Sequence, residues 1–124
     1  MPLLAKPICF CATTQPEKSR TFYQETLGFR LVSESTVALV FEMNGLMLRV
    51  QKVDKFAPQS FTMLGWEVKD IRATVKELTA KGVEFKRYKR LPQDDQGIWT
   101  TPDKEHVAWF KDPDGNVLSL TQFK

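Results

Sequence analysis

The stretch from His106 to Gln122 limits the possible folds of this chain more than any other part of the sequence. Two apolar runs flank the turn sequence DPDGN, in which proline presets φ and glycine can adopt the left-handed conformation that closes a hairpin. Pairing the first and last residues of this turn places Trp109 opposite Ser119 on a face of mixed polarity, which can line a cavity. The other face is wholly apolar and should pack against a helix: Ala108, Phe110, Leu118 and Leu120.

The first half of the chain predicts a strand, a helix and three further strands. Thr14 and Glu17 have the spacing of a capping box, and Gly28 follows an apolar helical stripe at the position of a C-terminal cap. Runs of β-favouring residues lie before and after this helix, at 6–13, 29–33, 36–43 and 46–53. This half is therefore predicted to form one βαβββ module.

The last two of these strands should form a hairpin around Asn44-Gly45, because this dipeptide between alternating runs is the strongest short hairpin signal. The turn pairs Met43 with Leu46 and so fixes the register. One face of the hairpin then belongs to the core: Leu39, Phe41, Leu48 and Val50. The opposite face is mixed: Val40, Glu42, Met47 and Arg49.

After a linker at 54–60, the same order of elements is predicted again. Asp70 can cap a helix that ends at Gly82, and the strands expected on either side of it are 61–68 and 83–88. The stretch Leu91–Lys104 has no counterpart in the first half, and an additional loop of this kind commonly carries specificity. We predict an α+β fold with two tandem βαβββ modules, about 1–56 and 57–124, in a single domain of residues 1–124.

Three short sequences, in the order FYQETLGF, GWEVKDI and WFKDPDGNVLSL, resemble the landmarks of the vicinal oxygen chelate superfamily, which includes glyoxalases, bleomycin resistance proteins and dioxygenases. The resemblance covers nearly the whole chain. It implies that the two modules form a curved, cup-shaped mixed sheet with the helices on its outer face. In that family the cup is completed within one chain or across a homodimer.

The family's chemistry usually depends on a divalent metal held by His and Glu side chains. The four positions that match those ligands hold other residues here: Ile8, Arg49, Met63 and Ser119. Arg49 would repel a cation. His106 is the single histidine of the chain, and we interpret it as a solvated residue at a strand end. We therefore predict no metal, no cofactor and no catalytic residue.

Without a metal, the mixed faces of the two modules have the composition of a small-molecule site. Trp109 offers a surface for stacking, Trp99 in the additional stretch can cover a ligand, and Arg49 can form a charge-assisted hydrogen bond with a carboxylate or phenolate. Glu67 can bind a cationic group, although a polar residue at the rim of the cup is the simpler interpretation. Strand parity adds four ligand-binding candidates: Phe10, Met47, Met63 and Ser119.

These features favour a metal-independent protein that binds a small aromatic or anionic compound, works as a homodimer and resembles the sequestering proteins of bleomycin-resistance type. Two alternatives stay open. One is a glyoxalase-like or dioxygenase-like enzyme of the same fold, a lyase, isomerase or dioxygenase that uses a divalent metal. The other is a structural partner whose cup is filled by its own side chains. The family's ligands are too diverse for the fold to identify the compound.

Composition and charge exclude several partners. The net charge is +3, but basic and acidic residues are interleaved, and the basic run 86–90 is interpreted as a solvated strand edge, so we predict no nucleic-acid partner. No apolar stretch reaches the roughly 18 residues of a membrane span, and the first residues do not resemble a signal peptide. Cys9 and Cys11 are interpreted as reduced thiols. We expect a cytoplasmic protein with no membrane partner.

Overall fold

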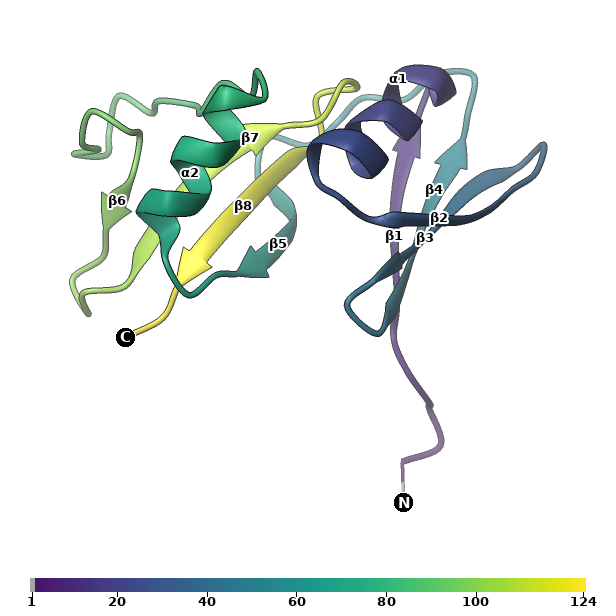
Figure 1. Ribbon diagram of the computed structural model, residues 1–124, viewed down its shortest axis with the longest axis horizontal. Helices are drawn as coiled ribbons and strands as arrows, with labels where there is room; N and C mark the ends of the chain where they lie inside the picture. Colours follow the sequence, from purple (N-terminus) through teal and green to yellow (C-terminus); the bar gives the residue numbers. More distant parts are fainter. Residues whose placement is uncertain (1) are drawn as a thin grey trace. The chain divides into compact units, whose positions relative to one another are not determined.

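A four-stranded mixed sheet and a helical segment make up each half of the chain (Figure 1). The computed structural model describes residues 2–124. Its internal contacts divide the chain into Met1–Ala57, here called unit 1, and Pro58–Lys124, here called unit 2. Each unit has one strand, a helical segment and three further strands in this order, which confirms the predicted α+β fold of two tandem modules.

Unit 1 consists of β1 (Ile8–Thr13), α1 (Pro16–Thr21), the π-helical turn η1 (Phe22–Thr26), β2 (Arg30–Glu34), β3 (Ala38–Met43) and β4 (Leu46–Lys52). The strand order is β1-β4-β3-β2, with β1 parallel to β4. Asn44 (φ 50°) and Gly45 (φ 89°) both have the positive φ that a type I′ hairpin requires, and Met43 pairs with Leu46 as predicted. The predicted core face is fully buried: Leu39, Phe41, Leu48 and Val50.

The start of α1 differs from the prediction. Gln15 is the N-cap residue and makes no side-chain cap hydrogen bond, so the predicted capping box of Thr14 and Glu17 is wrong. The hydroxyl of Thr13 instead accepts hydrogen bonds from the backbone N–H of Gln15 (3.0 Å) and from the hydroxyl of Ser19 (2.7 Å). Because the preceding strand supplies this polar anchor, the helix begins one residue later than a Thr14 cap would place it.

The helix widens into η1 before it ends. The backbone N–H of Leu27 donates to the carbonyl of Phe22 at 2.9 Å, five residues back, as a π-helical turn requires. This wider turn accompanies the complete burial of Tyr23, whose ring lies 5.7 Å from that of Phe41. Gly28 follows with φ 81°, in agreement with its predicted capping position. No helix in the described part of the chain is long and apolar enough to cross a membrane.

Unit 2 consists of β5 (Thr62–Glu67), α2 (Ile71–Ala80), β6 (Trp99–Thr100), β7 (His106–Lys111) and β8 (Val117–Gln122), with the strand order β5-β8-β7-β6. The carboxylate of Asp70 caps α2 by accepting a hydrogen bond from the N–H of Ala73 at 3.1 Å. Trp109 pairs with Ser119 in the predicted register. Helix α2 lies across β7 and β8 (Figure 1), where the predicted apolar face is buried: Ala108, Phe110, Leu118 and Leu120.

The predicted strand at 83–88 is wrong, because these described residues form no strand. Two other segments form hydrogen bonds with the edge of β7 that this strand would occupy. Trp99 and Thr100 of β6 pair with the first residues of β7, and the backbone N–H of Lys86 donates to the carbonyl of Trp109 at 2.8 Å. The fourth strand of unit 2 therefore comes from the additional stretch Leu91–Lys104, which the sequence suggested only as a loop.

Candidate functional site

Unit 2 has a cluster of aromatic side chains around Trp109, called here the aromatic face: Tyr88, Trp99 and Trp109. Trp109 points away from α2, because the residues before and after it in β7 are buried on the helix side. Its ring stacks on that of Trp99 with centroids 6.1 Å apart and planes 26° apart, and it forms a T-shaped contact with Tyr88 at 5.3 Å. The indole Nε1 of Trp109 donates a hydrogen bond to the hydroxyl of Thr62 at 3.0 Å. The structure therefore brings together Trp109, which was predicted to stack on a ligand, and Trp99, which was predicted to cover it.

A single amide side chain fixes the segments that carry Tyr88 and Trp99. The Oε1 atom of Gln93 accepts a hydrogen bond from the backbone N–H of Tyr88 at 2.6 Å. Its Nε2 atom donates to the carbonyl of Lys86 at 2.9 Å and to that of Gly97 at 2.8 Å. The backbone of Gln93 also forms a β-bridge with Trp99. Gln93 thus positions both aromatic neighbours of the central tryptophan.

The loop that carries Trp99 is further organised by Asp94. One carboxylate oxygen accepts hydrogen bonds from the backbone N–H groups of Gln96 (2.9 Å) and Ile98 (3.0 Å), and the other forms an ion pair with Arg72 of α2 at 2.9 Å. Burial opposes the charged form of Asp94, but these hydrogen bonds and Arg72 outweigh that effect, so the pKa of the carboxyl lies below its ordinary value. Trp99 is therefore held by a structured loop.

The other predicted residues of unit 2 lie near the aromatic face with different degrees of exposure. Ser119 is only 7% exposed and pairs with Trp109 on one side and Gly65 on the other. A Cβ atom at Gly65 would lie 2.5 Å from the hydroxyl oxygen of Ser119, so the absence of a side chain permits this approach. Glu67 is exposed at the end of β5, and Met63 is a half-buried residue within a β-bulge of that strand.

The mixed face of unit 1 holds the other three predicted residues. Arg49 is half-buried and pairs with Phe10 of β1 and with Val40 of β3. Phe10 is 48% exposed, and Met47, two residues from Arg49 on β4, is 40% exposed. Met47 also lines an open groove with a volume of about 610 Å³, which has these apolar residues in its wall: Ile8, Val32, Val40 and Met47. This face thus combines apolar side chains with a few charged ones, Arg49 and Glu42 among them.

The residues present do not fit a divalent metal. The family's ligand positions hold an alkyl group at Ile8, a cation at Arg49, a thioether at Met63 and a hydroxyl at Ser119. Hard divalent ions prefer carboxylate oxygens, borderline ions such as Zn, Fe and Ni also accept imidazole, and a guanidinium cannot coordinate either kind. Across residues 2–124, no group of three or more His, Cys, Asp or Glu side chains is arranged so that it could hold a metal ion.

Three residues of these faces were missed by sequence reasoning. Tyr88 was expected only as the end of a strand, and its contact with Trp109 depends on the Gln93 hydrogen bond. Thr62 reaches Trp109 because the bulge in β5 changes the strand's alternation, and Val32 lies at a similar irregularity in β2. Bulges have no reliable signature in a single sequence, so period-two alternation could not find either residue.

The tandem βαβββ fold and the two mixed faces are those expected of a vicinal oxygen chelate protein. The sequence pattern of the Glyoxalase/Bleomycin resistance protein/Dioxygenase superfamily matches residues 8–120, and the chain belongs to this superfamily. A comparison with curated proteins gave no match.

Solved structures with the same fold include three bacterial proteins. The genomically encoded fosfomycin resistance protein from Listeria monocytogenes is 14% identical, with a TM-score of 0.76 over 99% of this chain and 96% of that one. A glyoxalase/bleomycin resistance protein/dioxygenase from Nocardioides is 20% identical, with a TM-score of 0.72 over 98% and 86% of the two chains. A glyoxalase family protein from Enterococcus faecalis is 22% identical, with a TM-score of 0.68 over 95% of each chain. At these identities the likeness concerns the fold alone.

Proposed function

We propose that this protein binds and sequesters a small aromatic or anionic compound without a metal ion. The observation that supports this proposal most is the stacked pair of Trp99 and Trp109, which presents aromatic surface on the side of Trp109 that points away from α2. Flat indole rings provide large contact areas at low conformational cost, because each side chain has only two rotatable bonds. A planar ligand is the natural partner of such a surface.

Arg49 is the residue we propose for an anionic group. Its guanidinium is permanently charged and can donate two parallel hydrogen bonds to a carboxylate. No carboxylate lies within ion-pair distance of Arg49 in the described residues, so this side chain is not committed to an internal salt bridge. Phe10 and Met47 beside it provide apolar contact for the rest of a ligand. We also propose a cytoplasmic homodimer as the working form.

A metal-dependent enzyme is the alternative function. We retain it because the chain shares its fold with a fosfomycin resistance protein and with a glyoxalase family protein. Native mass spectrometry of protein purified without added metal or chelator distinguishes the two functions directly. We expect a metal-free dimer, with or without a small organic adduct. One tightly bound Mn, Fe, Ni or Zn ion per subunit would overturn the metal-independent proposal and favour the enzyme.

Tryptophan fluorescence tests the aromatic face itself. Titration with 4-nitrobenzoate, a planar aromatic anion, should quench the emission of the wild-type protein to saturation. The Trp109→Ala variant should lose the saturable part of this quenching, because the central ring of the aromatic face is gone. Trp66→Phe is the matched control: Trp66 stacks on the core residue Phe110, so its loss should leave the titration midpoint unchanged. Equal midpoints for Trp109→Ala and wild type would contradict the proposal.

A further inference from the structure

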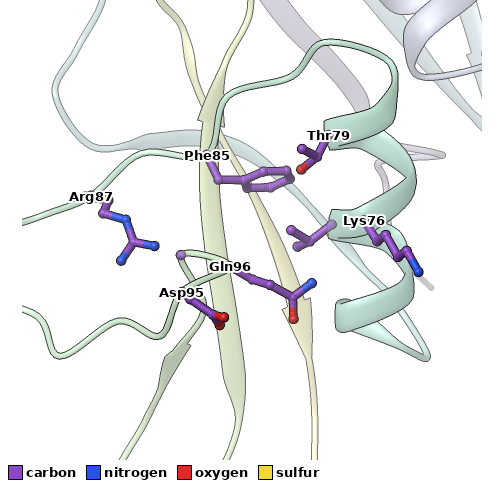
Figure 2. Close-up of a pocket in the computed structure, with 8 residues that line it drawn as sticks. Lys76, Thr79, Phe85, Arg87, Asp95 and Gln96 are labelled. Carbon is purple, nitrogen blue, oxygen red and sulfur yellow. The ribbon is translucent and has the colours of Figure 1, made fainter.

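Unit 2 contains a cavity that lies on the helix side of the sheet and does not include any residue of the aromatic face. It has a volume of about 430 Å³ and lies between α2 and the loop around Gly97 (Figure 2). Phe85 and Val75 supply its apolar surface, and the ring of Phe85 packs at 5.4 Å against the core residue Phe110. We call this cavity the helix-side pocket.

Internal contacts hold the walls of the helix-side pocket in place. Arg72 of α2 donates hydrogen bonds to Asp94 (2.9 Å) and to the side-chain oxygen of Gln96 (3.0 Å), and the Gln96 amide donates back to the Arg72 carbonyl at 3.2 Å. Gly97 has φ 83°, and a Cβ atom there would lie 3.3 Å from the Cβ of Phe85. Glycine at this position therefore keeps a side chain out of the space beside Phe85, and the protein's own contacts hold the pocket walls.

The rim of the pocket has two cationic side chains and one anionic side chain. Lys76 extends from α2, whereas Arg87 and Asp95 lie on the loop side of Phe85 (Figure 2). Within residues 2–124, neither Lys76 nor Arg87 has a carboxylate within ion-pair distance. The pocket thus combines an apolar floor with cations that are not neutralised by the protein. Such a combination is complementary to a small apolar molecule with one negative group.

We propose that the helix-side pocket is a second binding site, specific for a small aryl-substituted carboxylate. The aromatic ring contacts Phe85 and Val75, and the carboxylate accepts hydrogen bonds from Arg87, whereas the amino group of Lys76 points away from Phe85 (Figure 2). Asp95 on the same rim disfavours ligands that carry more than one negative charge. The proposal does not depend on ligand binding at the aromatic face, because the two sites share no residue.

Titration with 3-phenylpropionate, followed by nitrogen-15 NMR of the full chain, tests this site. The backbone amide signals of Val75, Gln96 and Gly97 should shift to saturation, and they should do so with the same Kd in the Trp109→Ala variant, which lacks the central ring of the aromatic face. Arg87→Gln should weaken binding about tenfold, the effect of losing one charge-assisted hydrogen bond. Arg90→Gln is the matched control, because Arg90 belongs to the same basic run but does not line the pocket, and its Kd should equal that of the wild type.

Two further measurements make the test decisive. Thr79→Phe places a large ring on an exposed helix position at the pocket wall and should abolish the shifts without disturbing the core. The uncharged analogue 3-phenylpropan-1-ol should bind about as weakly to the wild type as 3-phenylpropionate binds to Arg87→Gln. Shifts confined to the aromatic face, a Kd unchanged by Arg87→Gln, or no saturable shift at any residue would each overturn the proposal.

Discussion

The side chain of Gln93 makes hydrogen bonds that the backbone of a neighbouring strand would make in a regular sheet. In an ordinary sheet the residues 86–88 would pair with a neighbouring strand, but here the Gln93 amide bonds to the backbone of Lys86, Tyr88 and Gly97. A glutamine amide can act as donor and acceptor at the same time, so it joins two chain segments that lack a regular ladder between them. The geometry of the aromatic face therefore depends on a residue that is not aromatic.

Replacing Gln93 with alanine should loosen both sides of the aromatic face. The free energy of unfolding should fall by about 1–3 kcal/mol, because three hydrogen bonds are lost and partly buried backbone groups are left unpaired. Urea unfolding measures this change, and near-ultraviolet circular dichroism reports the altered tryptophan packing. Gln93→Glu keeps the acceptor but sets a carboxylate oxygen against the carbonyls of Lys86 and Gly97, so it should destabilise the protein at least as much as Gln93→Ala at neutral pH. A stability equal to wild type for Gln93→Ala would refute this role.

Gly65 and Ser119 lie in close contact, and the effects of substituting each residue on stability can be measured separately. Gly65→Ala should lower the free energy of unfolding by about 1–3 kcal/mol, because the new methyl group would lie 2.5 Å from the Ser119 hydroxyl oxygen. Ser119→Ala alone should have a smaller effect. The double variant should be more stable than the sum of the two single changes predicts, since removal of the hydroxyl relieves most of the overlap. Additive changes in a double-mutant cycle would show that the two side chains do not collide.

At the scale of elements, the stretch Leu91–Lys104 is the part in which the two modules differ. It forms β6, positions Trp99 and builds one wall of the helix-side pocket. Asp94 organises it from within and connects it to α2 through Arg72. One loop thus contributes to two surfaces on different sides of the sheet.

The contribution of Asp94 should depend on pH. Its pKa in the folded protein is lower than the ordinary value of 3.8, so its stabilising effect is complete above the unfolded-state pKa and is lost as the pH falls through the folded-state pKa. Asp94→Asn should therefore be less stable than wild type at neutral pH, and the difference should vanish below the lowered pKa. Urea midpoints of both proteins across this range measure the effect.

Sequence patterns predicted some elements correctly and failed at others for identifiable reasons. Both hairpins formed in the predicted register, because their turn residues and alternation point to the same pairing. The predicted strand at 83–88 does not form, because β6 pairs with β7 and the Gln93 side chain bonds to the backbone of this segment. These are tertiary contacts, which sequence patterns do not show. The predicted capping box is wrong because the hydroxyl of Thr13 accepts a hydrogen bond from the backbone at the start of the helix. For the site, parity predicted which way Trp109 points, but Tyr88 and Thr62 depend on tertiary contacts and a bulge.

At the scale of the whole molecule, unit 1 exposes an apolar surface on its mixed face. Four side chains there are between 40% and 51% exposed: Ile8, Phe10, Val32 and Met47. Scattered apolar residues are normal on a protein surface, but a contiguous group often marks a site of interaction. This group is the surface on which we base the proposed homodimer.

The variant Phe10→Glu should weaken that dimer. A charge in place of a phenyl ring within this apolar surface is costly to bury, so sedimentation equilibrium should show a larger monomer fraction than for wild type. Val37→Glu is the control, because Val37 is similarly exposed at 60% but does not belong to the apolar surface of Ile8, Phe10, Val32 and Met47. A Phe10→Glu protein that dimerises as strongly as wild type would exclude this surface, and a monomeric wild-type protein would exclude the dimer.

The alternation of β7 also has an evolutionary consequence. Ala108 and Phe110 are completely buried on the helix side, whereas Trp109 between them points the other way. The residues that pack under α2 and the residue at the centre of the aromatic face thus alternate along a single strand. A substitution at Trp109 changes the aromatic face and its contacts with Trp99, Tyr88 and Thr62, but it leaves the side chains under α2 unaltered. Under the proposed function, lineages with this architecture can therefore vary the binding surface by single substitutions that leave this part of the core unchanged.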